Sequence, residues 1–297
     1  MASIITDLKT KYRNANTSMR FIYINVAIFI CTMLLQVVLM LFNRSMTSLF
    51  EWFELPASFT RFATQPWSII SYMFMHANLL HILFNMAWLY SFGMLFLHFF
   101  SARHLRGVYF LSGICGGLLY MIAYNVFPYF HSMTAHSYLL GASASVLGIV
   151  VATAYRAPNY TIRLMLFGNL RLKYLALIVV ITDLLFMTSS NAGGHIAHLG
   201  GALAGWWFAA SLDKGKDITS LINTGIDALL KLFEKKPNKP KMKVTPGGGG
   251  RQSDYDYNAR KKAQSEEIDR ILDKLKKSGY ESLTTEEKKS LFDASKR

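Results

Sequence analysis

Long apolar runs, separated by short polar segments, dominate residues 1–212 of the chain. A helix needs roughly 20 mostly apolar residues to cross a membrane, and residues 21–42 meet that requirement outright. Five further runs are candidates for spans. Together they predict an all-α, polytopic membrane domain with a bundle of six transmembrane helices. The other predicted spans are residues 78–99, 105–127, 143–155, 172–188 and 195–212.

The distribution of charge separates the chain into two parts. Only 17% of the residues are charged, whereas soluble domains have roughly 25%. Residues 1–212 hold 12 Lys/Arg and 4 Asp/Glu, and residues 213–297 hold 20 and 14. The first part therefore resembles a membrane domain and the second a small soluble, basic tail. Because much of the basicity lies beside apolar runs, we expect the lipid bilayer and no nucleic acid as a partner.

The lysines and arginines also predict the orientation in the membrane, since cytoplasmic segments are the basic ones. With six crossings, the basic segments before span one, between spans two and three, and between spans four and five all lie on one side. Arg44 and Arg61 are then the only strong bases before the tail on the other side. We therefore expect both termini in the cytoplasm. The apolar connection of residues 43–66 is expected in the external membrane interface.

Polar side chains inside predicted spans are candidate functional residues, because they are costly in lipid unless paired or hydrated. Ser143 opens the fourth span, where Gly141 permits a tight turn and the helix N-terminus would stabilise an oxyanion. His81 and Asn85 share one face of the second span and offer hydrogen-bond donors. Taken alone, each of these groups also has a structural interpretation, as a contact within or between helices.

The sixth span opens with His195 and His198. Gly201 and Gly205 follow at a spacing that lets two helices approach closely. If this glycine face meets the helix that begins at Ser143, His198 comes within hydrogen-bond distance of the hydroxyl and could take its proton. His195 would line the same face or only hydrate the mouth of the cavity.

Three motifs occur in one order along the chain, and together they are far more specific than any one alone. With them, residues 20–212 resemble the rhomboid family of intramembrane serine proteases, of the bacterial type with an appended cytoplasmic helical tail. The sequence departs from the family pattern at Ala144, where the family usually has glycine, and at Ser68, where an arginine often follows the tryptophan. The motifs are residues 76–85 (HANLLHILFN), 141–144 (GASA) and 197–205 (AHLGGALAG).

The resemblance implies a catalytic Ser–His dyad with no acidic third member, no metal and no cofactor. Ser143 would be the nucleophile and His198 the general base. His81, Asn85 and the backbone N–H of Ser143 would form the oxyanion hole. The implied substrates are single-pass transmembrane proteins, cleaved near the external face of the bacterial inner (cell) membrane.

Several further residues would support this site. Gly201 matches the family glycine that allows close packing behind the catalytic histidine, Gly205 continues that pattern, and Gly141 permits the turn before the nucleophile. His76 matches a family histidine whose implied role is water retention or loop structure. Asp183, in the fifth span, has no place in the implied dyad. We expect it to hydrogen-bond within the bundle or, alternatively, to tune a gate.

Two other functions are open. An inactive rhomboid-like protein that binds or escorts clients would usually lack a reacting residue, whereas Ser143 and His198 are both present. A transporter or metal-handling protein could use the histidines, but no His-Glu-x-x-His motif occurs and no second carboxylate accompanies Asp183. Cys31 and Cys115 lie in apolar runs and predict neither a disulfide framework nor a zinc cluster.

The tail is predicted to have three parts. Residues 213–234 contain an amphipathic helix for the cytoplasmic membrane surface, and residues 235–258 form a flexible basic linker. Within residues 259–297, apolar spacing and a capping box of Thr284 and Glu287 predict a helical hairpin. The hairpin is too small for a convincing core of its own, so it packs on itself or on a protein partner. The segments before the tail are the cytoplasmic N-terminus, residues 1–20, and the membrane domain, residues 21–212.

Overall fold

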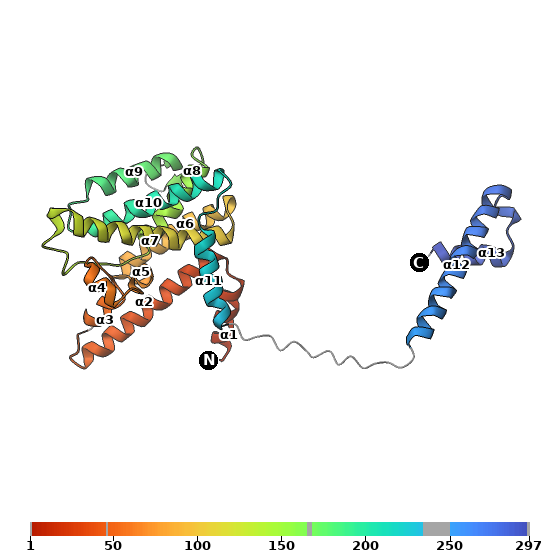
Figure 1. Cartoon of the computed structure of the whole chain (residues 1–297), viewed down its shortest axis with the longest axis horizontal. Helices are drawn as coiled ribbons and strands as arrows, with labels where there is room; N and C mark the ends of the chain where they lie inside the picture. The colour runs from red at the N-terminus through yellow and green to blue at the C-terminus, as the bar shows by residue number, and fades with distance from the viewer. Residues whose placement is uncertain (1, 46, 165–167, 234–249, 296–297) are drawn as a thin grey trace. The chain divides into compact units, whose positions relative to one another are not determined.

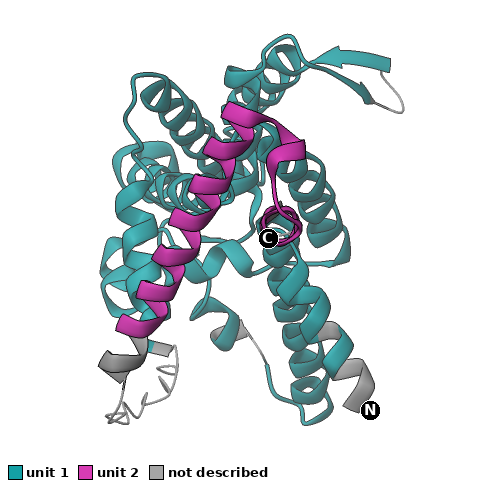
Figure 2. Cartoon of the chain, turned by 90° about the vertical axis from the view of Figure 1, so that its right-hand side faces the viewer, with its two compact units in different colours: residues 1–234 teal, residues 235–297 magenta. Residues whose placement is uncertain are grey.

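The computed structural model of the chain describes residues 2–45, 47–164, 168–233 and 250–295. These residues are predominantly α-helical, as predicted. Their contacts divide the chain into two compact units, Met1–Glu234 and Lys235–Arg297, which Figure 2 colours separately.

The first unit has a helix at each of the six predicted spans (Figure 1). Among its described helices, three are long and apolar enough to cross a membrane, namely α2, α6 and α7, and α8 is a shorter apolar helix. Helix length and composition therefore support three of the six predicted spans directly. The six helices are α2 (Thr17–Leu41), α6 (Leu79–Phe99), α7 (Ala102–Val126), α8 (Ser143–Arg156), α9 (Leu172–Leu185) and α10 (Ala192–Asp213).

Capping residues explain why two of these helices begin before their apolar runs. The Asn16 side chain accepts a hydrogen bond from the backbone N–H of Met19 at 2.9 Å and starts α2. Ser101 does the same for the N–H of His104 at 3.1 Å and starts α7. An N-cap of this kind satisfies backbone donors that the first turn leaves free, so the polar first turn is helical too.

Helices α7, α8 and α10 form the centre of the bundle, and glycines let them approach closely. A Cβ on Gly201 would overlap the carbonyl oxygen of Ala144, and a Cβ on Gly205 would overlap that of Gly148. On α7, a Cβ on Gly116 would lie 2.7 Å from the methyl group of Ala144. The predicted glycine contact between the fourth and sixth helices is thus present. The methyl group that departs from the family pattern fits because α7 has a glycine opposite it.

The connection between α2 and α6 is structured. Its short strand β1 (Leu55–Pro56) pairs antiparallel with β2 (Tyr138–Leu139), the segment just before α8. The Trp67 indole stacks on Trp52 with ring centroids 5.5 Å apart, and its N–H donates to the Trp52 carbonyl at 2.8 Å. The connection therefore reaches the nucleophile side of the bundle. Its other elements are α3 (Thr47–Glu51), α4 (Phe59–Thr64), α5 (Ser68–Ser71) and η1 (Tyr72–Phe74).

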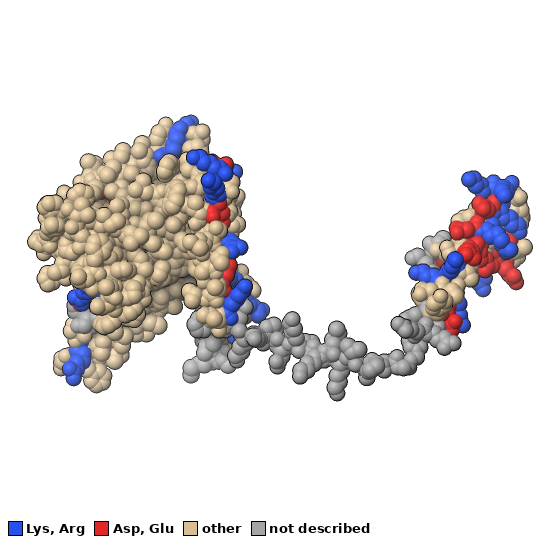
Figure 3. All heavy atoms as spheres, in the orientation of Figure 1, with Lys and Arg blue, Asp and Glu red and all other residues tan. Residues whose placement is uncertain are grey.

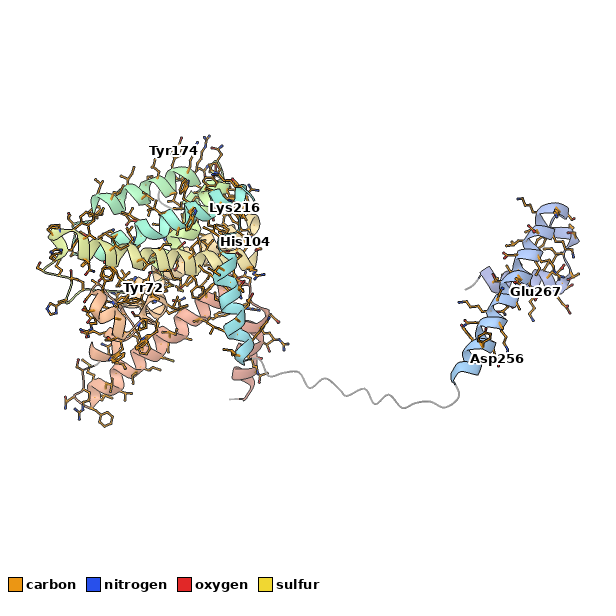
Figure 4. All side chains as sticks on the ribbon, in the orientation of Figure 1. Tyr72, His104, Tyr174, Lys216, Asp256 and Glu267 are labelled. Carbon is orange, nitrogen blue, oxygen red and sulfur yellow. The ribbon has the colours of Figure 1, made fainter. Side chains whose placement is uncertain are left out.

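Charged side chains gather at one end of the first unit, and a broad uncharged region separates them from two smaller basic groups near the other end (Figure 3). At the charged end, Arg156 and Asp213 pair at 3.1 Å, so the last turns of α8 and α10 lie together. Figure 4 places His104 and Lys216 at this end and Tyr72 nearer to the other. Because α8 and α10 end together there, Ser143 and the histidines of α10 lie toward the opposite end.

The remaining elements of the unit are α1 (Ala2–Asn14), η2 (Pro128–Phe130), the β3 (Thr161–Leu164) and β4 (Gly168–Arg171) hairpin, and α11 (Ser220–Phe233).

The second unit is a helical hairpin. Glu287 accepts a hydrogen bond from the backbone N–H of Thr284 at 2.9 Å, and Thr284 Oγ1 accepts one from the Glu287 N–H at 3.3 Å. This is the predicted capping box, and Lys274 also pairs with Glu287 at 2.8 Å. The first helix begins within the predicted linker, because the polar residues after the glycine run continue its helix. Residues 235–249 of that linker lie outside the described residues. The elements are α12 (Gly250–Ser278), η3 (Tyr280–Ser282) and α13 (Thr285–Ser295).

Candidate active site

Ser143 is the first residue of α8, and a tight turn before it is tied to the connection between α2 and α6. Gly141 has a φ of 121°, a conformation that side chains disfavour. Its N–H donates to the Tyr72 carbonyl at 2.9 Å. Tyr72 in turn donates its hydroxyl to the Gly113 carbonyl of α7 at 2.6 Å. The connection and α7 together therefore hold the turn that presents Ser143.

The start of α6 holds His81 and Asn85 through the backbone. The Asn78 side chain caps the helix by accepting from the His81 N–H at 2.9 Å. Because His81 Nδ1 accepts from the Ala77 N–H at 3.4 Å, the proton of the neutral ring lies on Nε2. Nε2 faces the turn before α8, 2.9 Å from where a Cβ on Gly141 would be. One amide hydrogen of Asn85 bonds the His81 carbonyl at 2.9 Å, which leaves the other for a ligand.

The start of α10 holds two histidines through a carboxylate. His198 Nδ1 lies 2.9 Å from Asp183 Oδ1, and His195 Nδ1 lies 2.8 Å from the same oxygen. The Asp183 side chain, on α9, is only 5% exposed. The sequence predicts a hydrogen bond of Asp183 within the bundle but not its contact with the predicted general base. The structure thus differs from the predicted dyad of Ser143 and His198, because an acidic residue lies beside His198.

A cavity of about 200 Å³ brings these elements together. Ser143 and His198 both line it, together with Asn85 and an apolar wall from α6, α8 and α9. No hydrogen bond joins the Ser143 hydroxyl to His198 among the described residues, and such bonds are often long before substrate binds. The predicted nucleophile, base and one oxyanion donor therefore share one cavity. The wall consists of Phe84, Trp88, Val146, Leu147 and Val179.

His81 lines a second, polar cavity of about 560 Å³. Its Nε2 and the Ser143 hydroxyl lie 2.9 Å and 3.6 Å from the position of a Cβ on Gly141, so the two side chains are close to each other. The second cavity is mainly polar, whereas the cavity that Ser143 lines has an apolar wall. Its other polar residues include Tyr120, Tyr124, His136, Tyr138 and Asn191.

His76 is buried beside His81, with ring centroids 5.1 Å apart. Burial, and to a smaller extent the neighbouring His81, lower the pKa of His76 to about 4. It is therefore neutral at physiological pH and packs behind His81 rather than lining either cavity. Of the two implied roles, the geometry favours loop structure.

The contact of Asp183 with the two histidines was missed because it joins separate helices. Its signal in the sequence was that Asp183 is the one carboxylate within the six predicted spans. His195 and His198 are three residues apart and thus share a helix face. Nothing in the sequence placed that face opposite Asp183, because the side chains of different helices meet only through packing.

Two known families match the chain. The family described as "Rhomboid domain" matches residues 63–214, which is just over half of the chain and contains every residue of the candidate site. A "Family of unknown function (DUF6576)" matches residues 252–297, within the second unit. No curated protein matches the chain.

Proposed function

Because the chain belongs to the rhomboid family, we propose that it is an intramembrane serine endopeptidase. Members of this family are generally serine proteases that act within membranes. The observation that carries the proposal is the cavity that Ser143, His198 and Asn85 line together. An inactive relative would usually lack one of the reacting groups.

The reaction follows from the chemistry of the two reacting groups. Nε2 of His198 takes the proton of the Ser143 hydroxyl while Oγ bonds to the substrate carbonyl carbon. His198 then gives this proton to the leaving nitrogen as the C–N bond breaks, which leaves an acyl ester on Ser143. Water then attacks the ester carbon while His198 accepts a proton from the water. His198 gives this proton to Oγ as the ester C–O bond breaks, which releases the carboxylic acid and frees Ser143.

Three donors are proposed to stabilise the oxyanion. They are Nε2–H of His81, the second amide hydrogen of Asn85 and the backbone N–H of Ser143. The last is one of the unpaired donors at the start of α8, where the helix dipole also favours negative charge. Donors fixed before reaction stabilise developing charge without reorganising.

We also propose six membrane crossings with both termini in the cytoplasm of the bacterial inner membrane. The charged end of the bundle would be the cytoplasmic end (Figure 3). With 14 residues, α8 is about 21 Å long, whereas the hydrocarbon core is about 30 Å thick. If Arg156 lies at the cytoplasmic surface, Ser143 lies roughly 10 Å beneath the external one. A single-pass substrate that unwinds near that surface would reach it.

The tail is proposed to consist of a surface helix, a linker that ends before α12, and a hairpin that binds a protein partner. The polar face of α11 is held at α7, where Asp227 pairs with Arg106 at 2.6 Å and with Arg103 at 3.2 Å. Its leucines stay exposed, as expected for a helix on a membrane surface. They include Leu221, Leu229, Leu230 and Leu232.

The test is cleavage of a single-pass transmembrane reporter in liposomes by the full chain and its Ser143→Ala and His198→Ala variants. We expect both variants to lose cleavage while keeping their thermal stability. Ser145→Ala is the matched control, because this neighbouring serine is buried away from the cavity and should be dispensable. Cleavage that survives either active-site change would overturn the proposal. Binding of the reporter without cleavage by the wild-type protein would favour the inactive, client-binding alternative.

A further inference from the structure

The cluster of Asp183, His195 and His198 has an arrangement that the proposed dyad does not explain. One carboxylate oxygen, Asp183 Oδ1, lies at hydrogen-bond distance from Nδ1 of both histidines, at 2.8 Å and 2.9 Å. The other oxygen, Oδ2, is buried and has no hydrogen-bond partner among the described residues. Asp183 therefore interacts through one oxygen, and both of its partners come from α10.

The direction of these hydrogen bonds determines where the histidine protons lie. An ionised carboxylate only accepts hydrogen bonds, so each imidazole must donate from Nδ1. A neutral His198 then has its lone pair on Nε2. Since Nδ1 is taken by Asp183, Nε2 is the nitrogen that remains for the cavity shared with Ser143. A general base for a serine hydroxyl needs this tautomer.

We propose that Asp183 is a positioning residue that holds His198 in the tautomer and orientation required of the base. Its charge also stabilises the imidazolium that forms when His198 takes the Ser143 proton. This inference rests on the proposed function. It replaces a dyad without an acidic member by a triad of Ser143, His198 and Asp183. Only Ser143 and His198 touch the substrate in this triad.

His195 has a separate part in this arrangement. A buried carboxylate is costly unless hydrogen bonds satisfy it, and no lysine or arginine pairs with Asp183 among the described residues. His195, one turn before His198, supplies the second donor. It thereby gives the buried carboxylate a second hydrogen bond without being part of the reacting pair, so its loss should have a smaller effect than loss of Asp183.

The same three residues could also hold a metal ion, since their ligand atoms lie within 4.8 Å of one another. Two features favour the hydrogen-bonded triad over a metal site. The oxygen–nitrogen distances of 2.8 Å and 2.9 Å are hydrogen-bond distances. A metal on His198 Nδ1 would also leave the proton of the neutral ring on Nε2, and the base for Ser143 would be lost.

The experiment compares Asp183→Asn with wild-type protein in liposomes, by reporter cleavage and by the rate at which a fluorophosphonate labels Ser143. We expect kcat to fall about 10²- to 10⁴-fold with KM within twofold, and labelling to slow in parallel. His195→Phe should cost less than tenfold. Asp213→Asn is the control, because it removes the same charge at the far end of α10 and should leave both rates unchanged.

A second measurement covers the case in which Asp183→Asn does not fold. In wild-type protein with ¹⁵N-labelled histidine, the Nδ1–H of His198 should give a strongly downfield proton signal that His198→Ala removes. Absence of that signal would overturn the inference. So would near-wild-type kcat in folded Asp183→Asn, or cleavage that EDTA abolishes and Zn²⁺ restores. If Ser143→Ala is inactive in these cases, the proposed protease stands. If the wild-type protein neither cleaves nor labels, both proposals fail.

Discussion

The starts of α6 and α10 each present a histidine close to Ser143, but the two rings are held in opposite ways. At α6, His81 Nδ1 accepts a backbone N–H from Ala77, so its Nε2 carries a proton. At α10, His198 Nδ1 meets the Asp183 carboxylate, so its Nε2 has a free lone pair. The group that holds Nδ1 thus decides whether the other nitrogen is a donor or a base.

The comparison explains how one residue type would supply the two proposed chemical roles in one site. The proposed donor and the proposed base are both imidazoles within the first two turns of apolar helices. A backbone amide and a carboxylate are enough to distinguish them, and neither needs a metal or a change of net charge on the histidine. Changes that remove one ring, or one of these partners, should therefore have unequal effects.

The largest difference is expected between removal of the base and removal of the donor. His198→Ala should lower kcat by about 10⁴-fold or more, because the serine proton then has no acceptor. His81→Ala should lower it by about 10²- to 10³-fold, the usual effect of losing one oxyanion donor. Both are measured with the transmembrane reporter at saturating concentration. His98→Ala, at the far end of α6, serves as the control. Equal losses in the two variants would show that the rings do not have different roles.

The next largest effect should come from separating α10 from α8. In Gly201→Val the new side chain would collide with the carbonyl group of Ala144. Overpacking of this kind costs roughly 1–3 kcal/mol, and a displacement of about 1 Å between reacting groups can cost about 10²-fold in rate. We expect a lower melting temperature and about a 10²-fold lower kcat.

The matched control for this change is Gly225→Ala on α11, where a new Cβ meets nothing within 4 Å. It should leave kcat unchanged and should not lower the melting temperature, because alanine favours a helix more than glycine does. Full activity in a folded Gly201→Val protein would mean that the α8–α10 contact does not set the distance between Ser143 and His198. The position of the proposed base, His198, would then depend on Asp183 alone.

A smaller effect is expected at the N-cap of α6. Asn78→Ala removes the acceptor for the His81 N–H and should destabilise the protein by about 0.5–2 kcal/mol. Because this turn also orients the His81 ring, kcat should fall about tenfold, less than removal of the ring itself. Asn16→Ala removes the same kind of cap from α2, away from the site. Asn16→Ala should lose as much stability as Asn78→Ala, measured by thermal unfolding, but should keep the wild-type kcat. Equal kcat values in the two variants would contradict a role for the cap in catalysis.

The sequence alone predicted much of this arrangement, and its failures have physical causes. The apolar runs predicted the helices because lipid-facing and core-facing residues are both apolar in such a domain. The glycine spacing predicted the approach of α10 to the helix that begins at Ser143. The contact with Asp183 could not be predicted, because it depends on how α9 packs against α10. The short strand pair β1–β2 was also missed, since two residues per strand leave no periodic pattern.

The smallest expected effect extends the comparison to a group controlled by burial rather than by a hydrogen-bond partner. Burial, with a smaller contribution from Glu51, raises the pKa of Glu54 in the connection between α2 and α6 from 4.5 to about 7. The folded protein therefore binds this proton more tightly than the unfolded chain does. The stability that results is fully present below pH 4.5 and is lost as the pH rises through about 7. Glu54→Gln should remove this loss.

Thermal unfolding at two pH values tests this prediction. At pH near 8, Glu54→Gln should melt roughly 2–4 °C above wild type, and the two should converge as the pH falls toward 4.5, where the carboxyl is protonated in both states. Glu51→Gln removes only the smaller cause, so most of the pH dependence should remain. A constant difference between Glu54→Gln and wild type at all pH values would mean that packing, not protonation, separates them. In that case burial would not control the protonation of Glu54. The comparison with His81 and His198, whose hydrogen-bond partners fix the position of the ring proton, would then fail.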